Sequence, residues 1–560
     1  MDNQRVFLYG ALFFVLFLIW QAWQKDHAPT PAPVETAIPG GQVSDADRDI
    51  DAVDRDLPQL DSTIAPEPVQ AKPVETPEQR AGEPVRVVTD VLDLTLTTQG
   101  GDIIEAVLLE YPVDKDTPDV KVELLTTDGK QLYVSQSGLR AAGDGSAPNH
   151  NAIYRTPATE YALAPGEESL TVSFFWQGDN GLEVEKRYTF QRGRYEIQLD
   201  YLVHNGGNVE WRGDAYLQLK KRQLESERSF FNPASYSYEG PAFFNGEQYN
   251  KLDLDDITET ALAATAPGGW AAMLEHYFLS AVIPPQDTQN RFYAAAVGPQ
   301  TYRVGYVQPA QLVPAGGETV FENRLFIGPK LQDRLAEVAP KLELAVDYGM
   351  LTIISEPLFW VLEKIHALIG NWGWAIVLLT LLIKVAFYKL QETSGKSMAR
   401  MRKMQPKMKA LKERYGDDRE KLNKAMMELY QKEKINPFAG CLPILIQMPV
   451  FFALYWVLLE SVELRQADWI LWINDLSSPD PWYILPVLMG VAMFGQQKLN
   501  PQPADPMQAK MLMIMPVMMI AFALFMPAGL VLYWVVNTGL SAAQQWQINR
   551  VIERKGYNKD

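Results

Sequence analysis

Apolar segments gathered in the C-terminal third of the chain constrain its fold more than any other feature. Five of them follow one another between residues 372 and 547, and a sixth lies near the N-terminus, at residues 6–23. A helix needs about 20 predominantly apolar residues to cross the hydrocarbon core of a bilayer. The pattern therefore predicts a polytopic α-helical membrane protein with six transmembrane helices.

Lys384 lies inside one of these segments, in the stretch "LLTLLIKVAFYKL". An ammonium group in the hydrocarbon region costs about 2.5–3.5 kcal/mol on insertion scales, which makes an intramembrane lysine a candidate functional residue. The alternative is that the side chain snorkels to the headgroups, since Lys389 is only about 7.5 Å further along a helix. Within this segment alone, both interpretations stay open.

The middle of the chain has a different composition from its apolar ends. The 560 residues carry a formal net charge of -17, which disfavours nucleic acid as the main partner. The charge and the position of the apolar segments together predict a large acidic, water-soluble domain. A single cysteine, Cys441, excludes an internal disulfide, so this domain must be stabilised by its core.

The N-terminal apolar segment is either a cleaved secretory signal or an uncleaved anchor. We expect an anchor, at residues 1–23, because no small-x-small cleavage site follows the segment and no cysteine is available there for a lipid. Residues 24–86 are rich in Pro, Ala, Asp and Glu and have no hydrophobic periodicity. They are predicted to form a disordered acidic linker.

Residues 87–345 show short alternating runs broken by turn residues, as in "LTVSFFWQGDNGLEVEKRYTF" with its Asp179-Asn180-Gly181 turn. Period-two alternation of this kind predicts one large all-β sandwich domain, with a helical segment at residues 331–344 leading out of it. The five histidines are scattered and have no metal-ligand spacing, so we expect no metal site and no cofactor. A sugar-binding or catalytic cleft stays open, although a structural or docking role is the preferred interpretation.

The remaining segments are assigned from hydropathy and charge. They are an interfacial amphipathic helix (346–371), TM2 (372–390), a helical hairpin (391–434), TM3 (435–460), a loop (461–481), TM4 (482–497), a loop (498–508), TM5 (509–526), TM6 (529–547) and a tail (548–560). The hairpin is basic and the 461–481 loop is acidic. By the positive-inside rule the hairpin, the 498–508 loop and both termini are cytoplasmic, and the β domain lies on the opposite side, in the periplasm.

The basic hairpin has an apolar stripe and a cationic surface. The stripe and cations in its first helix are Met398, Met401, Met404, Met408, Arg400, Arg402 and Lys403. The methionines either form the seam with the returning helix or offer a flexible surface to passing hydrophobic chains. The cations would then face RNA or acidic partners.

Polar residues recur on one face of three predicted spans. In the last span Tyr533, Asn537 and Ser541 are spaced four residues apart; Thr380 precedes Lys384 by the same interval in TM2, and TM3 contributes Gln447. Polar groups in lipid face one another or a water-filled cavity, so these stripes predict a hydrated groove. Ordinary hydrogen bonding between helices is the alternative.

The stretches "NPFAGCLPILIQMPVFFALYWVLLESVELRQA", "DPWYILPVLMGVAMFGQQKLNP" and "MPAGLVLYWVVN" resemble the YidC/Oxa/Alb family of membrane protein insertases, in its Gram-negative form. The resemblance covers essentially the whole chain. It implies a five-helix insertase core, a periplasmic β-supersandwich, and a cytoplasmic hairpin over a groove with one essential cation. Lys384 occupies that position in place of the family's arginine, and Tyr533-Trp534 replaces a Tyr-Tyr pair.

The resemblance also implies a function and partners. The chain would be an inner-membrane insertase and folding chaperone, not an enzyme, that works alone or with the Sec translocon. Its partners would be nascent membrane proteins, the ribosome, Sec components, membrane lipids and the signal recognition particle receptor.

Two other classes of protein share single features with this sequence. An intramembrane serine protease at Ser541 lacks a histidine within any span to act as base. A transporter or channel would use similar polar stripes, but the sequence shows no inverted repeats or paired half-helices.

Overall fold

The computed structural model describes residues 82–128, 131–142, 146–223, 235, 237–259, 261–298, 300–416, 418–432, 442–499 and 506–555. The predicted anchor and nearly all of the predicted linker lie outside these residues, as does Cys441. The described chain divides into two compact units. The β unit runs to Trp360 and includes Ala453–Ser478; the helical unit comprises Val361–Phe452 and the residues from Pro479 onward.

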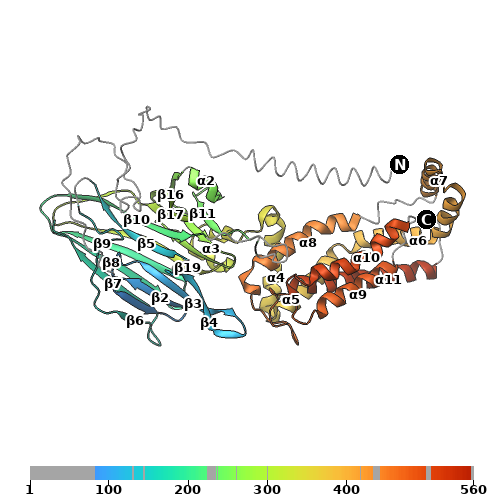
Figure 1. Ribbon diagram of the computed structural model, residues 1–560, viewed down its shortest axis with the longest axis horizontal. Coiled ribbons are helices and arrows are strands. Elements are labelled where there is room, and N and C mark those ends of the chain that lie inside the picture. The colour runs from blue at the N-terminus through green and yellow to red at the C-terminus, as the bar shows by residue number, and fades with distance from the viewer. Residues whose placement is uncertain are drawn as a thin grey trace, which may run out of the picture. The chain divides into compact units, whose positions relative to one another are not determined.

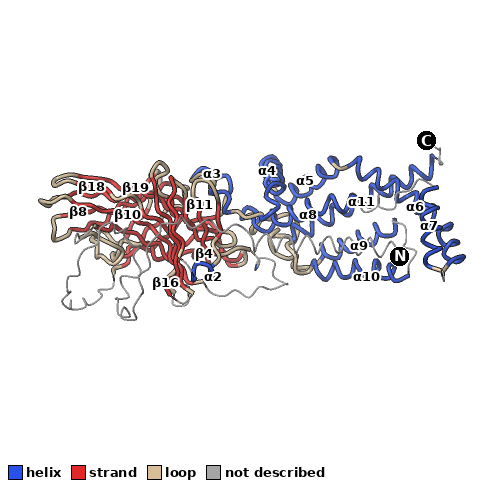
Figure 2. The backbone as a smooth tube through the Cα atoms, turned by 90° about the horizontal axis from the view of Figure 1, so that it is seen from above, coloured by secondary structure: helices blue, strands red, loops and turns tan. Residues whose placement is uncertain are grey.

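The β unit contains two large sheets, and the predicted all-β domain is confirmed (Figures 1 and 2). The strands of the first sheet, in spatial order, are β13 (Leu262–Pro267), β16 (Gln289–Gly298), β17 (Thr301–Val307), β10 (Trp211–Arg222), β5 (Tyr133–Ala141), β3 (Ile103–Asp114), β2 (Leu92–Thr97), β1 (Pro84–Val88) and β6 (Glu160–Ala162), with β18 (Gln311–Val313) on β10 and β4 (Thr117–Leu125) on β3. Those of the second sheet are β12 (Tyr249–Lys251), β11 (Gly240–Phe244), β14 (Trp270–Leu274), β15 (Phe278–Ile283), β19 (Glu318–Pro329), β9 (Glu196–Asn205), β8 (Leu182–Gln191) and β7 (Ser169–Gln177).

The core lies between the two sheets, because alternate residues of each strand point inward. In β9 every second residue is buried, in the order Ile197, Leu199, Tyr201 and Val203. The Tyr201 hydroxyl donates to Ser137 Oγ of the opposite sheet at 2.8 Å. Period-two alternation is therefore the direct cause of this fold.

Two local details refine the predicted β domain. The turn at Asn180 joins β7 to β8 as expected, with Gly181 at a φ of 80° that favours glycine. The first strand begins at Pro84 and not at residue 87, because Pro84–Val88 pairs antiparallel with β2, and the Arg86 side chain adds two hydrogen bonds to Asp93 of 3.0 and 2.6 Å. The end of the predicted linker is therefore part of the sheet.

Helices make up the rest of the described chain. They are α2 (Leu254–Glu259), α3 (Gln332–Val338), α4 (Thr352–Ile369), α5 (Trp372–Ala386), α6 (Tyr388–Tyr415), α7 (Arg419–Lys432), α8 (Leu442–Glu460), α9 (Ile484–Leu499), α10 (Pro506–Ala523) and α11 (Ala528–Lys555). Helix α3 and a 3-10 turn at Leu342–Ala345 confirm the helical segment predicted after the β domain.

No single helix in the described ranges meets the length and hydropathy criteria for a membrane span. Trp372–Ala386 and Tyr388–Met401 meet them only as a pair, and they are bent by 68° at the break between them. Shorter apolar helices occupy Gln447–Glu460, Ile484–Leu499 and Lys510–Ala523. Helix α5 thus ends at Ala386, four residues before the predicted end of TM2 at 390.

Candidate functional site

Helix α5 places Lys384 in its last turn. The helix begins where the Asn371 side chain accepts a hydrogen bond from the Trp374 backbone amide at 3.0 Å, and its remaining residues are almost all apolar. Lys384 is only 6% exposed. Its side chain is therefore buried among the described helices.

A chain of hydrogen bonds connects α5, α8 and α11 around this lysine. The Lys384 ammonium donates to Ser541 Oγ at 2.6 Å, and the Ser541 hydroxyl donates to the Asn537 backbone carbonyl at 2.7 Å. The Asn537 side-chain oxygen accepts from the amide of Gln447. Four residues predicted to line a groove are thus brought together from three helices.

The charge of Lys384 has no acidic partner in this arrangement. Across the described helices no Asp or Glu oxygen is recorded within 4.0 Å of its Nζ. A neutral hydroxyl satisfies one of the three N–H donors. The ammonium is therefore buried with its charge uncompensated by the described part of this chain, which costs free energy unless water or another molecule stabilises the charge.

The other predicted groove residues have more varied positions. Thr380 is buried, and its hydroxyl donates to the Ile376 carbonyl of its own helix at 2.7 Å. Among the described residues it therefore shows no hydrogen bond to the series that links Lys384 with Gln447. The rings of Tyr533 and Trp534 lie 6.1 and 4.9 Å from that of Phe451. Sequence reasoning missed Phe451, whose one signal was its position four residues after Gln447 on the same helix.

Helices α6 and α7 occupy most of the range 391–434 assigned to the hairpin, and side chains of the two helices pack together. Helix α6 ends at Tyr415 with Gly416 as its C-cap, and Asp418 Oδ1 accepts from the Lys421 amide at the start of α7 at 3.1 Å. Met404 and Met408 are buried in a cluster with residues of both helices: Met401, Met426, Leu429 and Tyr430. Met398 is half-buried, while Arg400 and Lys403 are exposed. This arrangement is the one expected if the methionines form the seam.

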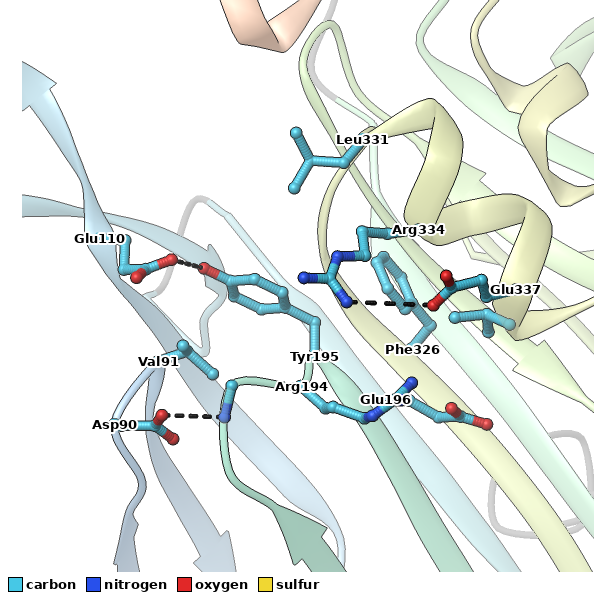
Figure 3. Close-up of a pocket in the computed structure, with 12 residues that line it drawn as sticks. Asp90, Val91, Glu110, Arg194, Tyr195, Glu196, Phe326, Leu331, Arg334 and Glu337 are labelled. Atoms are coloured by element: carbon cyan, nitrogen blue, oxygen red, sulfur yellow. Dashed lines mark hydrogen bonds and ion pairs between the residues drawn. The ribbon is translucent and has the colours of Figure 1, made fainter. Parts of the chain in front are cut away.

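A pocket of about 310 Å³ lies in the β unit, beside α3. Figure 3 shows the Tyr195 ring pointing across it, with its hydroxyl at Glu110, to which it donates at 2.9 Å. Arg194 and Arg334 also line the pocket. Its described lining contains no histidine. Carboxylates and guanidinium groups both line it, so its surface carries charges of both signs. Nothing in its geometry assigns it a reaction.

Buried polar groups gather where the β unit meets the end of α8, within the same compact unit. His276 donates from Nε2 to the Leu459 carbonyl at 2.9 Å, and burial lowers its pKa to about 4. Ser237 donates to the Glu460 carboxylate at 2.9 Å. Lys330 is 2% exposed, and burial lowers its pKa to about 8 against the attraction of Glu460. These residues lie far apart in the sequence, so no sequence motif predicted that they would come together.

Comparisons with known proteins give the family. The model of the YidC periplasmic domain matches residues 84–361, and that of the 60Kd inner membrane protein matches residues 364–555. The membrane protein insertase YidC of Thioalkalivibrio sulfidiphilus is 48% identical over 99% of this chain and 100% of its own length. The same holds for that of Nitrosococcus oceani, at 48% identity and the same coverage.

A solved structure is also similar. It is described as an active YidC insertase with the first transmembrane domain resolved, and it has a TM-score of 0.37 and 19% identity over 83% of this chain and 92% of that chain. The match to the YidC periplasmic-domain model covers the large two-sheet domain described above. The family models and the full-length relatives show that the chain belongs to the YidC family of membrane protein insertases.

Proposed function

We propose that the chain inserts nascent membrane proteins into the bacterial inner membrane through a hydrated groove around Lys384, alone or with the Sec translocon. The observation that carries the proposal is a buried ammonium bonded to a neutral hydroxyl, with no carboxylate of the described chain beside it. Such a group is expensive to keep unless something else supplies the negative charge. Acidic residues in the translocated part of a client would supply it.

The mechanism involves no covalent chemistry. The polar tail of a client enters the groove, where Lys384 attracts its acidic residues and the amides of Gln447 and Asn537 replace water. Lysine presents a compact charge, whereas the family's arginine presents a planar fork, so capture here depends less on bidentate geometry. The apolar segment of the client then moves into lipid, and its own burial drives release.

The proposal includes a topology. Six spans place the basic hairpin and both termini in the cytoplasm and the β domain in the periplasm, in agreement with the charge asymmetry of the loops. The hairpin, with Met398 half-buried and Arg400 and Lys403 exposed, would receive the client and contact the ribosome or the signal recognition particle receptor. The β domain would dock against Sec components.

The test is insertion into liposomes that contain only this protein, with a client whose translocated tail is acidic. We expect Lys384→Arg to retain activity and Lys384→Leu to lose about tenfold, equivalent to about 1.4 kcal/mol. A client with a neutral tail should be affected much less, because it offers no charge to attract.

The matched control is Lys389→Leu, which removes an exposed cation five residues away. It should insert both clients as the wild type does. Equal insertion of the acidic client by Lys384→Leu and wild type would show that hydration alone operates the groove and that charge attraction is not part of the mechanism.

A further inference from the structure

The loop that joins α8 to α9 carries an uncharged apolar tip, with the sequence "WILWI" at residues 469–473. Two backbone hydrogen bonds close the tip: Trp469 donates to the Ile473 carbonyl at 3.0 Å, and Ile473 donates to the Ile470 carbonyl at 3.1 Å. Leu471, between them, has a φ of 57° and is 81% exposed. A bulky residue held in this conformation is a strained outlier, which calls for a functional explanation.

The base of the loop is well ordered around Asp475. One carboxylate oxygen accepts from the Gln466 backbone amide at 3.0 Å and from the Ser477 hydroxyl at 2.7 Å, and the other accepts from the Ser478 hydroxyl at 2.7 Å. Ile473 is buried. Leu471 is therefore exposed at the end of a loop whose base is held by hydrogen bonds.

The hairpin formed by β3 and β4 clamps the loop from within the same unit. The Lys115 ammonium donates to the carbonyls of Gln466 and Asn474 at 3.2 and 2.8 Å. In return, the Arg465 guanidinium donates to the Pro112 carbonyl at the hairpin at 2.7 Å. These bonds fix the direction of the tip relative to the β sheets of that unit.

We propose that the tip of this loop, with Ile470 and Leu471 exposed at its end, inserts into the lipid headgroup region on the periplasmic side of the membrane and anchors the β unit there. The inference rests on the proposed function, because it takes α8 and α9 to be consecutive spans. The loop that joins two such helices emerges at the membrane surface.

The chemistry of the tip favours lipid over a protein partner. Two tryptophans flank the aliphatic pair Ile470 and Leu471, and Trp is enriched at membrane interfaces, where its ring sits at the level of the headgroups. No charge within the tip would select a protein surface. Burying the exposed leucine side chain among lipids is favourable and can offset the strain at its backbone.

The test uses a fluorescent label at the tip. The chain's single cysteine allows a Cys441→Ser background, into which Leu471→Cys is introduced and labelled with an environment-sensitive dye. The matched control is Val209→Cys, a 78% exposed aliphatic residue after β9 of the same unit. Each full-length protein is reconstituted in vesicles, and quenching is measured with nitroxide lipids and with aqueous iodide.

A label about 5–10 Å below the headgroup boundary should be quenched by nitroxide lipids at least about twofold more than the label at position 209, and by iodide correspondingly less. Equal quenching at both positions would overturn the inference. So would a label at position 471 that neither quencher reaches, since protein would then cover the tip.

The same vesicles report on the proposed function separately. If they insert the acidic client while the label at 471 stays aqueous, only the membrane anchor is wrong. If the label lies in lipid but the wild-type protein inserts no client, the anchor stands and the proposed function fails. Lys115→Gln, which weakens the clamp, should raise iodide quenching at position 471 and leave position 209 unchanged.

Discussion

Both units of the molecule bury lysines, and Lys186 of the β unit differs from Lys384 of the helical unit in the groups that its ammonium contacts. In the β unit, Lys186 is fully buried, donates to Asp102 at 3.1 Å and to the Gly100 carbonyl at 2.8 Å, and lies 5.5 Å from the centre of the Tyr188 ring. In the helical unit, Lys384 is nearly as buried but is bonded to the hydroxyl of Ser541. The Lys186 ammonium has Asp102 as its counterion within the fold. The Lys384 ammonium has no carboxylate beside it among the described residues.

Under the proposed function, this difference separates a structural charge, Lys186, from a functional one, Lys384. A buried ion pair with its donors satisfied serves the fold, because removing either partner leaves an uncompensated charge. A buried charge without a counterion weakens the fold and is retained only where another molecule completes it. Burial alone therefore does not identify a functional lysine, whereas the nature of its partners does.

The largest expected effect follows from breaking the pair in the β core. Lys186→Met leaves Asp102 buried without a counterion and should cost about 3–5 kcal/mol in the free energy of unfolding. The measurement is the thermal unfolding midpoint of the full-length protein in detergent. The pair joins β8 of the second sheet to the first sheet, and Asp102 also accepts from the Ser137 amide of β5 at 3.0 Å within the first sheet.

The control for this prediction removes both charges. Lys186→Met combined with Asp102→Asn should recover much of the lost stability, because an amide can be buried with far less penalty than a carboxylate. An unfolding midpoint of Lys186→Met equal to that of wild type would show that the pair contributes nothing to the fold.

A smaller effect concerns His276, which lies in the β unit at the end of α8. Burial holds its folded-state pKa at about 4, below its ordinary value near 6.5, so folding keeps the ring neutral. The resulting stability is fully present above pH 6.5 and is lost as the pH falls from 6.5 towards 4. We expect a loss of about 1–3 kcal/mol across this window.

The measurement is the unfolding midpoint as a function of pH, compared with that of His276→Gln. Glutamine can donate to the Leu459 carbonyl but does not titrate, so its profile should be flatter between pH 4 and 6.5. Parallel profiles for the two proteins would mean that other groups cause the acid sensitivity.

Replacing Lys384 with methionine should raise the free energy of unfolding, whereas Lys186→Met should lower it. Lys384→Met replaces an uncompensated buried charge with an apolar side chain of similar length, so it should stabilise the protein by about 1–2 kcal/mol while lowering insertion of the acidic client. Unfolding and insertion are measured on the same preparation. A lower unfolding midpoint would show that Lys384, like Lys186, serves the fold.

The sequence predicted those features that depend on local periodicity. Alternation gave the β domain, and hydropathy singled out Lys384 together with Asn537 and Ser541 on one face of a later helix. Lys186 was overlooked although it occupies an inward position between Val184 and Tyr188, because alternation marks the face of a residue but not its partner. The contacts of His276 and Lys330 join distant parts of the chain, so they required the tertiary structure.

The smallest expected effect is that of Gln447→Leu, which distinguishes two roles of the polar residues around Lys384: packing between helices and lining a hydrated groove. If the bond from Gln447 to Asn537 only joins two helices, Gln447→Leu should change the free energy of unfolding by under about 1 kcal/mol and leave insertion unaltered, as for most hydrogen bonds between membrane helices. If the pair lines hydrated space that receives the client's tail, insertion of the acidic client should fall while stability barely changes.

The control is Met448→Leu, an exposed neighbour that takes no part in these hydrogen bonds, which should alter neither stability nor insertion. Stability and insertion measured together on Gln447→Leu therefore distinguish helix packing from a groove, and equal insertion by variant and wild type would favour packing.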